Sequence, residues 1–291
     1  MLTVFLIFIV LLAFIFLGFP IFMSLLITGI LFLTLGGNSL GLTVIKMFGS
    51  ANSLSLLAIP YFVIAGNIIM KARITDKLVN FADAAVGWLP GGLGHVNVLA
   101  SMIFGGIQGS GCADAAAIGG MLIPAMEKQG YDKDYSVAVT AGSSMLSPII
   151  PPSIAMILYS YYTEVPVGRL FMGALVPGIL LGLLQMGVVY LEYRLRKYDI
   201  PRTRFSLRNL LTTAWHSLGA LMMPLIILSG ICFGIVTPTE SGVLAILYGL
   251  LYGFCISKTL KWSDIPGILI DSAVTTSVVY MTIVGAGVLS N

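Results

Sequence analysis

The sequence predicts an all-α polytopic membrane protein, and three observations lead to this fold class. Charged residues make up 9% of the 291 residues and hydrophobic residues 58%, and the mean hydropathy is +1.01. So few charges cannot cover a water-soluble core. Long uncharged runs separated by short basic segments are typical of helices that cross a bilayer.

The first two helices are predicted within residues 2–35, a run without charge. As one helix this run would be about 50 Å long, whereas the hydrocarbon core is about 30 Å thick. Gly18-Phe19-Pro20 is the expected turn between two spans, because proline is tolerated at the start of a helix. A cleavable signal peptide over residues 2–17 is the alternative. No basic residue precedes the apolar stretch, so we expect a retained span.

A third span is expected over residues 52–70, and an amphipathic helix over residues 74–88. Apolar residues recur in this helix at helical spacing, beside a polar face with Asp76, Lys77, Asn80 and Asp83. Such a helix is expected to lie along the membrane interface. Its apolar stripe consists of Ile74, Leu78, Phe81, Ala85 and Trp88.

Residues 91–130 are predicted to form a re-entrant hairpin. Its arms, residues 94–104 and 113–126, are short for a span of about 20 residues, and its glycine-rich tip covers residues 105–112. The next helix, residues 134–161, is expected to be interrupted at residues 147–152, which contain three prolines. Unwound backbone at membrane depth survives only where protein or a polar cavity covers it, so both breaks are candidate binding sites.

Further spans are expected over residues 170–193, 212–236, 239–256 and 268–289. With the hairpin counted as non-crossing, thirteen Lys and Arg fall on the side of the 194–208 loop, and only Lys46 and Arg169 fall on the other. The positive-inside rule therefore places this loop in the cytoplasm and the N-terminus in the periplasm. The loop is interpreted as a topology determinant, with anionic-lipid binding left open. No feature suggests nucleic-acid binding.

Five crossings per unit would make a second copy enter the membrane inverted. Pro20 and Pro238 lie 218 residues apart, and each follows a turn that contains glycine. Residues 63–66 and 283–286 agree loosely with this offset. We therefore expect residues 1–208 to be a first repeat and residues 209–291 to be the start of a truncated second repeat. Chance recurrence of proline and glycine in apolar sequence is the alternative.

Several ordered motifs resemble the large membrane (M) subunit of tripartite ATP-independent periplasmic (TRAP) transporters. Three positions depart from the usual family pattern: Gln108 stands in place of Ser, Gly111 in place of Ala and Ser147 in place of Gly. Members of this family are longer, so the chain is expected to be C-terminally incomplete. The motifs are Gly105–Ser110, Ala113–Gly119, Ser143-Ser144 and Pro148–Ser153, together with Ala58–Gly66, Trp88–Gly92 and Thr237–Glu240.

The resemblance implies sodium-coupled import of an organic acid across the bacterial inner membrane by an elevator motion, with no cofactor besides the coupling ion. It also implies three partners besides the lipid bilayer: a small four-helix membrane subunit, a periplasmic substrate-binding protein and a small carboxylate substrate. The three cysteines, Cys112, Cys232 and Cys255, form no CxxC pair. We therefore expect neither a disulfide framework nor a transition-metal centre.

The candidate ion ligands are hydroxyls and carbonyls at the two breaks, because hard cations prefer oxygen. Helix packing through small residues is the alternative for each position. The predicted ion site consists of Gly106, Gly109, Ser110, Ser143, Ser144 and Ser147. The predicted substrate cavity consists of Ser110, Gly111, Asp114, Ser144, Pro151 and Pro152.

Asp114 has two interpretations, because it follows the hairpin tip. It either caps the second arm or contacts the ion or substrate directly. An antiporter or efflux carrier is the alternative function, and it is expected to place an essential acid or base at the breaks. An intramembrane hydrolase is disfavoured, because no GxSxG elbow precedes a suitable His and acid.

Overall fold

The computed structural model describes residues 2–37, 39–196, 198 and 205–290. The regular elements in these ranges are helices, with no strand, which confirms the all-α fold class. By internal contacts the chain forms two compact units, residues 1–57 with 270–291 and residues 58–269. They are called the first and second unit below. Lys197, Arg202 and Arg204 of the predicted basic loop lie outside the described residues.

In the first unit, helices α1 (Leu2–Phe16) and α2 (Ile21–Leu35) are joined at the predicted turn. Gly18 there has a φ of +87°, a conformation that favours glycine. Helix α2 packs against the C-terminal part of α13 (Ile265–Leu289) through small residues. A Cβ atom on Gly29 would lie 2.9 Å from Val288 Cγ1, and one on Gly285 would lie 2.9 Å from Leu25 Cβ.

The third predicted span, residues 52–70, was wrong at its start. Helix α3 (Leu40–Ala51) was not predicted, and Asn52 follows its last residue. A 3-10 turn, η1 (Ser55–Leu57), then precedes α4 (Ala58–Lys71). The polar residues Asn52 and Ser53 lie in neither helix, so they end α3 and separate it from η1 and α4.

In the second unit, α4 packs closely against α12 (Pro238–Leu251). A Cβ atom on Gly242 would lie 2.7 Å from Tyr61 Cβ, and one on Gly249 would lie 3.0 Å from Ile68 Cγ2. The contacting residues rise together along both helices, so the pair is parallel. A π-helical segment, η2 (Tyr252–Ile256), and a 3-10 turn, η3 (Trp262–Asp264), follow α12.

The amphipathic segment forms α5 (Ile74–Val86), which is shorter than the predicted residues 74–88. It packs against α6 (Gly92–Gln108) and α11 (Leu207–Cys232). Ile74, Leu78 and Ala82 are its fully buried residues, whereas Trp88, beyond its end, is 41% exposed. The buried stripe is therefore narrower than predicted, because only part of the apolar face has a partner helix.

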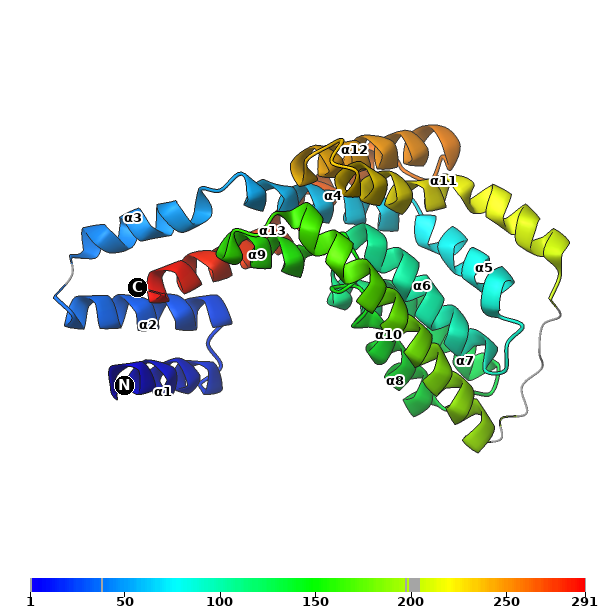
Figure 1. Ribbon diagram of the computed structural model, residues 1–291, viewed down its shortest axis with the longest axis horizontal. Helices are drawn as coiled ribbons and strands as arrows, with labels where there is room; N and C mark the ends of the chain where they lie inside the picture. The colour runs from blue at the N-terminus through cyan, green and yellow to red at the C-terminus, as the bar shows by residue number, and fades with distance from the viewer. Residues whose placement is uncertain (1, 38, 197, 199–204, 291) are drawn as a thin grey trace. The chain divides into compact units, whose positions relative to one another are not determined.

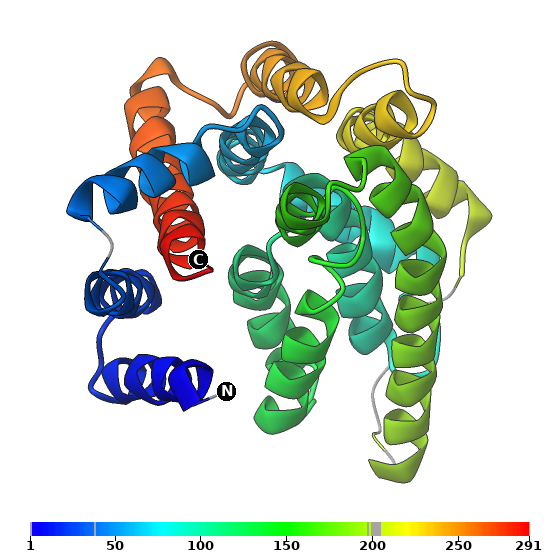
Figure 2. The same cartoon turned by 60° about the vertical axis from the view of Figure 1, so that its left-hand side comes forward.

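Helices α6, α7 (Gly111–Lys128), α8 (Lys133–Ser144) and α10 (Val167–Arg196) lie side by side in both ribbon views (Figures 1 and 2). Helix α9 (Ile154–Thr163) lies between α8 and α10 in the chain. The core of this bundle contains Val98, Leu146, Ile150 and Val189, and each of them is at most 6% exposed.

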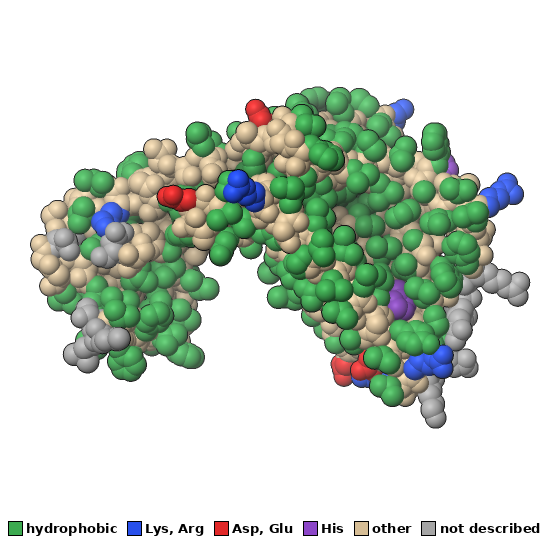
Figure 3. All heavy atoms as spheres, viewed as in Figure 1, with side chains coloured by type: hydrophobic (Ala, Val, Ile, Leu, Met, Phe, Trp, Pro, Cys, Tyr) green, Lys and Arg blue, Asp and Glu red, His purple; other side chains and the backbone are tan. Residues whose placement is uncertain are grey.

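Among the described residues, four helical segments are long and apolar enough to cross a bilayer: residues 167–196, 207–232, 238–256 and 262–289. Residues 41–51 and 55–71 pass the same test together, with a bend of 60° between them. Their outer faces carry exposed apolar side chains; Leu183, Leu184 and Leu191 of α10 are each more than half exposed. Hydrophobic side chains also predominate on the molecular face in Figure 3, where charged side chains are few. The protein is therefore a multi-pass membrane protein.

Candidate ion and substrate site

The first helix break separates α6 from α7 and is only two residues long. Helix α6 continues to Gln108, and Gly109 ends it with a φ of +64°. Ser110 then caps α7, accepting a hydrogen bond of 3.5 Å from the Ala113 N–H. The predicted tip, residues 105–112, was too long, because glycines next to a packed neighbour remain helical.

The second break interrupts the predicted helix 134–161 between α8 and α9, at residues 145–153. It is wider than the predicted interval 147–152. A hydrogen bond of 2.6 Å spans most of this break: the Ser153 hydroxyl donates to the Pro148 carbonyl. The same hydroxyl accepts from the Met156 N–H over 3.3 Å, so Ser153 also caps α9.

The two breaks face each other at close range. A Cβ atom on Gly105 would lie 2.7 Å from Ser147 Cα, and one on Gly111 would lie 3.0 Å from the Ser144 carbonyl oxygen. A Cβ atom on Gly106 would lie 3.5 Å from the Pro151 carbonyl oxygen. A larger side chain in place of Gly105 or Gly111 would therefore force the hairpin and the broken helix apart.

Two helix N-termini also converge at this point. A Cβ atom on Gly109, next to the start of α7, would lie 2.7 Å from Ser153 Cα and 3.1 Å from the Ile154 nitrogen, where α9 begins. The C-terminal ends of α6 and α8 approach the same region through Gly105, Gly111 and the break residues. The region thus combines the positive and negative ends of helix dipoles.

Several oxygen atoms of the second break have no hydrogen-bond partner among the described residues. Within the described residues, no hydrogen bond reaches the carbonyls of Ser147, Ile149, Pro151 or Pro152. The Ser147 hydroxyl is fully buried and has no partner among these residues either. Buried polar atoms are normally paired, so these oxygens are suited to bind a hard cation.

The predicted ligand Ser143 lies in a buried hydrogen-bond network between α6 and α8. Its hydroxyl donates to Asn97 Oδ1 over 2.8 Å and accepts from the Ser101 hydroxyl over 3.1 Å. The Asn97 side-chain amide in turn donates to the Thr140 hydroxyl over 2.7 Å. Ser144 donates within its own helix, to the Ala141 carbonyl over 2.9 Å. Only the lone pairs of these serines therefore remain for a ligand.

Asp114 is fully buried in α7, and neither carboxyl oxygen has a hydrogen-bond partner among the described residues. Ser101 of α6 lies beside this carboxyl group. Ser110 supplies the side-chain cap of α7, and Asp114 lies in the first turn of that helix, where a carboxylate also complements the helix dipole. A buried carboxylate without a partner is costly unless a proton or cation neutralises it.

Asn97, Ser101, Thr140 and Gln108 were not among the predicted site residues. A signal was present in the sequence: Asn97, Ser101, Gly105 and Gln108 recur at helical spacing on one side of α6. The Gln108 side chain lies against Gly66 of α4, and its Oε1 atom has no partner within the described residues. Polar residues on one face of an apolar helix indicate a polar interior, and this stripe was overlooked.

These features define a class: polytopic membrane proteins in which two interrupted helical segments meet and expose backbone oxygens. Residues 8–291 match the family described as "Tripartite ATP-independent periplasmic transporter, DctM component". The chain belongs to this family.

Three curated relatives support the assignment. The uncharacterized protein YgiK of Salmonella typhimurium is 40% identical over 82% of this chain and 54% of its own length. The sialic acid TRAP transporter large permease protein SiaM of Vibrio cholerae is 34% identical, with 94% and 64% covered. The C4-dicarboxylate TRAP transporter large permease protein DctM of Pseudomonas aeruginosa is 36% identical, with 83% and 56% covered. The chain spans about half to two thirds of the length of these relatives.

Proposed function

We propose that the chain is part of the large permease of a secondary transporter that imports an organic acid across the bacterial inner membrane, coupled to sodium. The family supports transport rather than catalysis, and the named substrates of two relatives, sialic acid and C4-dicarboxylates, are organic acids. The observation that carries the proposal is the contact between the two helix breaks, with unpaired oxygens on one side and two helix N-termini on the other.

The coupling cation is assigned to the second break. Ser147 Oγ and the nearby carbonyl oxygens of the break supply oxygen ligands without losing existing hydrogen bonds. Their sodium affinity follows from the preference of hard cations for oxygen. The predicted ligands Ser110, Ser143 and Ser144 line the same region with oxygens already engaged as hydrogen-bond donors or caps.

The substrate carboxylate is assigned to the paired N-termini of α7 and α9. Backbone N–H groups at helix N-termini bind anions, and two such ends meet around Gly109 and Ser153. This arrangement can bind an anion without a basic side chain. The predicted substrate residues Gly111 and Pro152 lie at these two ends.

The inverted repeat is supported by reciprocal helix pairing. Helices α2 and α12 begin 217 residues apart, at Ile21 and Pro238. Within the second unit α12 pairs with α4, and within the first unit α2 pairs with the end of α13. With an offset of 218 residues, α4 of the first repeat corresponds to residues 276–289 of the second, in the C-terminal part of α13. Each of the two helix pairs therefore consists of one helix from each repeat, and the two pairs correspond to each other with the repeats interchanged. We therefore keep residues 1–208 and 209–291 as the proposed repeats.

The proposed partners are a small membrane subunit and a periplasmic substrate-binding protein, because relatives of this chain are named as large permeases of tripartite systems. The proposed orientation, with the N-terminus in the periplasm, follows from the distribution of Lys and Arg. An elevator motion would carry the hairpin and the broken helix together, since the two segments pack closely against each other at Gly105 and Gly111.

The test is uptake of the organic acid into proteoliposomes that contain the complete permease and its partners, with and without an inward sodium gradient. Ser147→Ala is expected to raise the sodium concentration for half-maximal uptake about tenfold, as loss of a cation-site group does. Ser110→Ala and Ser144→Ala are expected to reduce uptake as well. Ser229→Ala is the control, because this exposed hydroxyl bonds only within α11.

Uptake that does not depend on sodium would overturn the coupling proposal. Asp114 gives the antiporter alternative its specific support, since a buried, unpaired acid can exchange protons. Organic-acid movement driven outward by an inward proton gradient, and lost in Asp114→Asn, would favour that alternative.

A further inference from the structure

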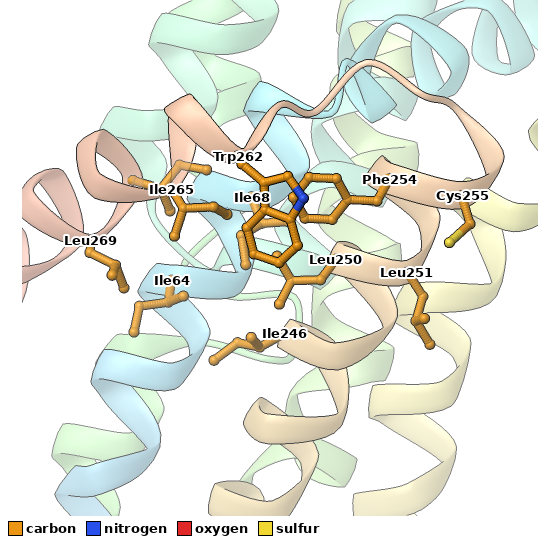
Figure 4. Close-up of a pocket in the computed structure, with 11 residues that line it drawn as sticks. Ile64, Ile68, Ile246, Leu250, Leu251, Phe254, Cys255, Trp262, Ile265 and Leu269 are labelled. Atoms are coloured by element: carbon orange, nitrogen blue, oxygen red, sulfur yellow. The ribbon is translucent and has the colours of Figure 1, made fainter.

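We propose that an open groove in the second unit binds an anionic phospholipid, with an acyl chain in the groove and the phosphate at its basic rim. The groove has a volume of about 620 Å³, which falls in the range of roughly 300–1,000 Å³ typical of small-molecule sites. Figure 4 shows its walls, which come from α4, α12, η2, η3 and the start of α13. This inference does not depend on the transport proposal.

The walls of the groove are apolar side chains. The lining residues Ile68 and Ile268 are buried and pack together with Leu260 beneath the groove surface. Ile64, Ile246 and Leu250 line it from two helices (Figure 4). Among the lining side chains, only the Cys255 thiol and the Trp262 ring carry a polar group. An acyl chain has no polar group to satisfy, so it fits such a surface.

Two aromatic rings mark the mouth of the groove. Phe254 and Trp262 stack with ring centroids 4.8 Å apart, and Trp262 is 80% exposed. Tryptophan is enriched at the level of lipid headgroups. The mouth is therefore expected to lie at the membrane interface, with the groove extending into the acyl region.

The rim of the groove is basic because the 257–261 loop folds onto the end of α4. The Thr259 hydroxyl donates to the Ala72 carbonyl over 2.8 Å. Lys71 and Arg73 flank Ala72 in the chain, and Lys258 precedes Thr259. One hydrogen bond thus brings together basic residues that lie more than 180 residues apart in sequence.

The charges at this rim are available for an anion. Lys71, Arg73, Lys258 and Lys261 are all exposed, and none forms an ion pair with the residues that the structure describes. The nearest acids in the chain are Asp76 in α5 and Asp264 in η3, whose carboxylate accepts the Lys261 backbone N–H over 3.0 Å. Lys77, one turn away in α5, is already engaged, donating to the Tyr252 hydroxyl over 2.7 Å. The rim therefore has net positive charge.

Charge complementarity selects an anionic lipid over other occupants. A zwitterionic lipid would fill the groove without using the rim, and a partner helix would use the groove without needing four cations. The Lys and Arg distribution predicts that this rim faces the cytoplasm, where anionic lipids are enriched. Phosphatidylglycerol is accordingly the probe for the experiment.

The experiment measures lipid contact at Cys255, an exposed residue of the groove wall. Cys112→Ser and Cys232→Ser leave Cys255 as the single site for a bimane fluorophore. The purified chain is placed in phosphatidylcholine nanodiscs that contain a minor fraction of doxyl-labelled phosphatidylglycerol or doxyl-labelled phosphatidylcholine. We expect stronger quenching by the anionic lipid. Equal quenching by the two lipids would overturn the proposal.

Charge variants test the rim. Lys258→Gln with Lys261→Gln is expected to weaken the anionic preference by roughly fivefold for each lysine removed. Lys128→Gln with Lys133→Gln is the matched control, because it removes the same charge at the far end of the hairpin, and it should keep the preference. An unchanged preference in the rim variant would contradict the assignment.

A groove variant tests the acyl site separately. Leu251 lines the groove and is 63% exposed, so Leu251→Trp should fill the space without disturbing the core. Native mass spectrometry is expected to show retained phosphatidylglycerol on the unmodified chain and less on this variant. Absence of quenching by both lipids would mean that a second copy or another protein covers the groove, and would overturn the proposal.

Discussion

Ser101 of α6 donates a hydrogen bond of 3.1 Å to Ser143 of α8. This bond joins the hairpin to the broken helix, and each of the two residues precedes the break of its own segment in the chain. Ser143 continues the network to Asn97 over 2.8 Å. Ser101 also lies beside the buried carboxyl group of Asp114 in α7. The network therefore joins α6 to α8 and helps the breaks to keep their geometry.

Ser143→Ala should destabilise the protein by about 1–3 kcal/mol, because the buried Asn97 Oδ1 atom and the buried Ser101 hydroxyl both lose their hydrogen bond to Ser143. Thermal unfolding in sodium-free buffer measures the effect without contributions from the proposed ion. Ser277→Ala is the control, since that exposed hydroxyl bonds only to the Ala273 carbonyl of its own helix. Equal unfolding temperatures for the two variants would show that the network contributes no stability.

Gly105→Ala should cost about 1–3 kcal/mol, because its methyl group would lie 2.7 Å from Ser147 Cα, and overpacking of this kind strains the backbone. Gly120→Ala in α7 is the control, since its Cβ would have no neighbour within 4 Å. That change is expected to be stabilising by about 0.4–1 kcal/mol. Opposite shifts in unfolding temperature are the expected result, and a tolerated Gly105→Ala would disprove the close approach.

Thr237→Ala should weaken the start of α12 by about 1 kcal/mol. The Thr237 hydroxyl accepts from the Glu240 N–H over 3.3 Å, and the Glu240 carboxylate accepts from the Thr237 N–H over 2.7 Å, which completes a capping box. Hydrogen exchange of the first turn of α12 should accelerate in the variant. Thr163→Ala, at the end of α9, should leave that exchange unchanged.

Stability should fall at alkaline pH through Tyr131, which lies between α7 and α8. Burial raises the pKa of the Tyr131 phenol to about 12, above its value of about 10 in an unfolded chain. The contribution is complete below pH 10 and is lost as the pH rises from 10 to 12, because only the unfolded state can ionise easily.

The measurement is the unfolding temperature of the wild-type protein and of Tyr131→Phe between pH 8 and about pH 11. The difference between the two curves cancels the titration of lysines. It should change above pH 10, with the variant losing less stability. Parallel curves across the whole range would mean that this phenol is not protected.

Particular elements show what could be read in advance from the sequence. The Gly18–Pro20 turn and the interruption around Pro148 were both predicted, because each depends on residues adjacent in the chain. Helix α3 was missed, and the hairpin tip was predicted too long. In both cases local composition was ambiguous, and neighbouring helices decided where the regular backbone ends.

Hydropathy and proline act locally, so the order of residues already indicates a helical membrane protein with two interrupted segments. Which oxygens remain unpaired depends on packing: Ser143 has partners on α6, whereas the Ser147 hydroxyl, four residues later, has none among the described residues. Packing also brings Lys258 to the end of α4 through the bond from Thr259. Hydrogen-bond partners distant in the chain are set by packing, and no local pattern records them.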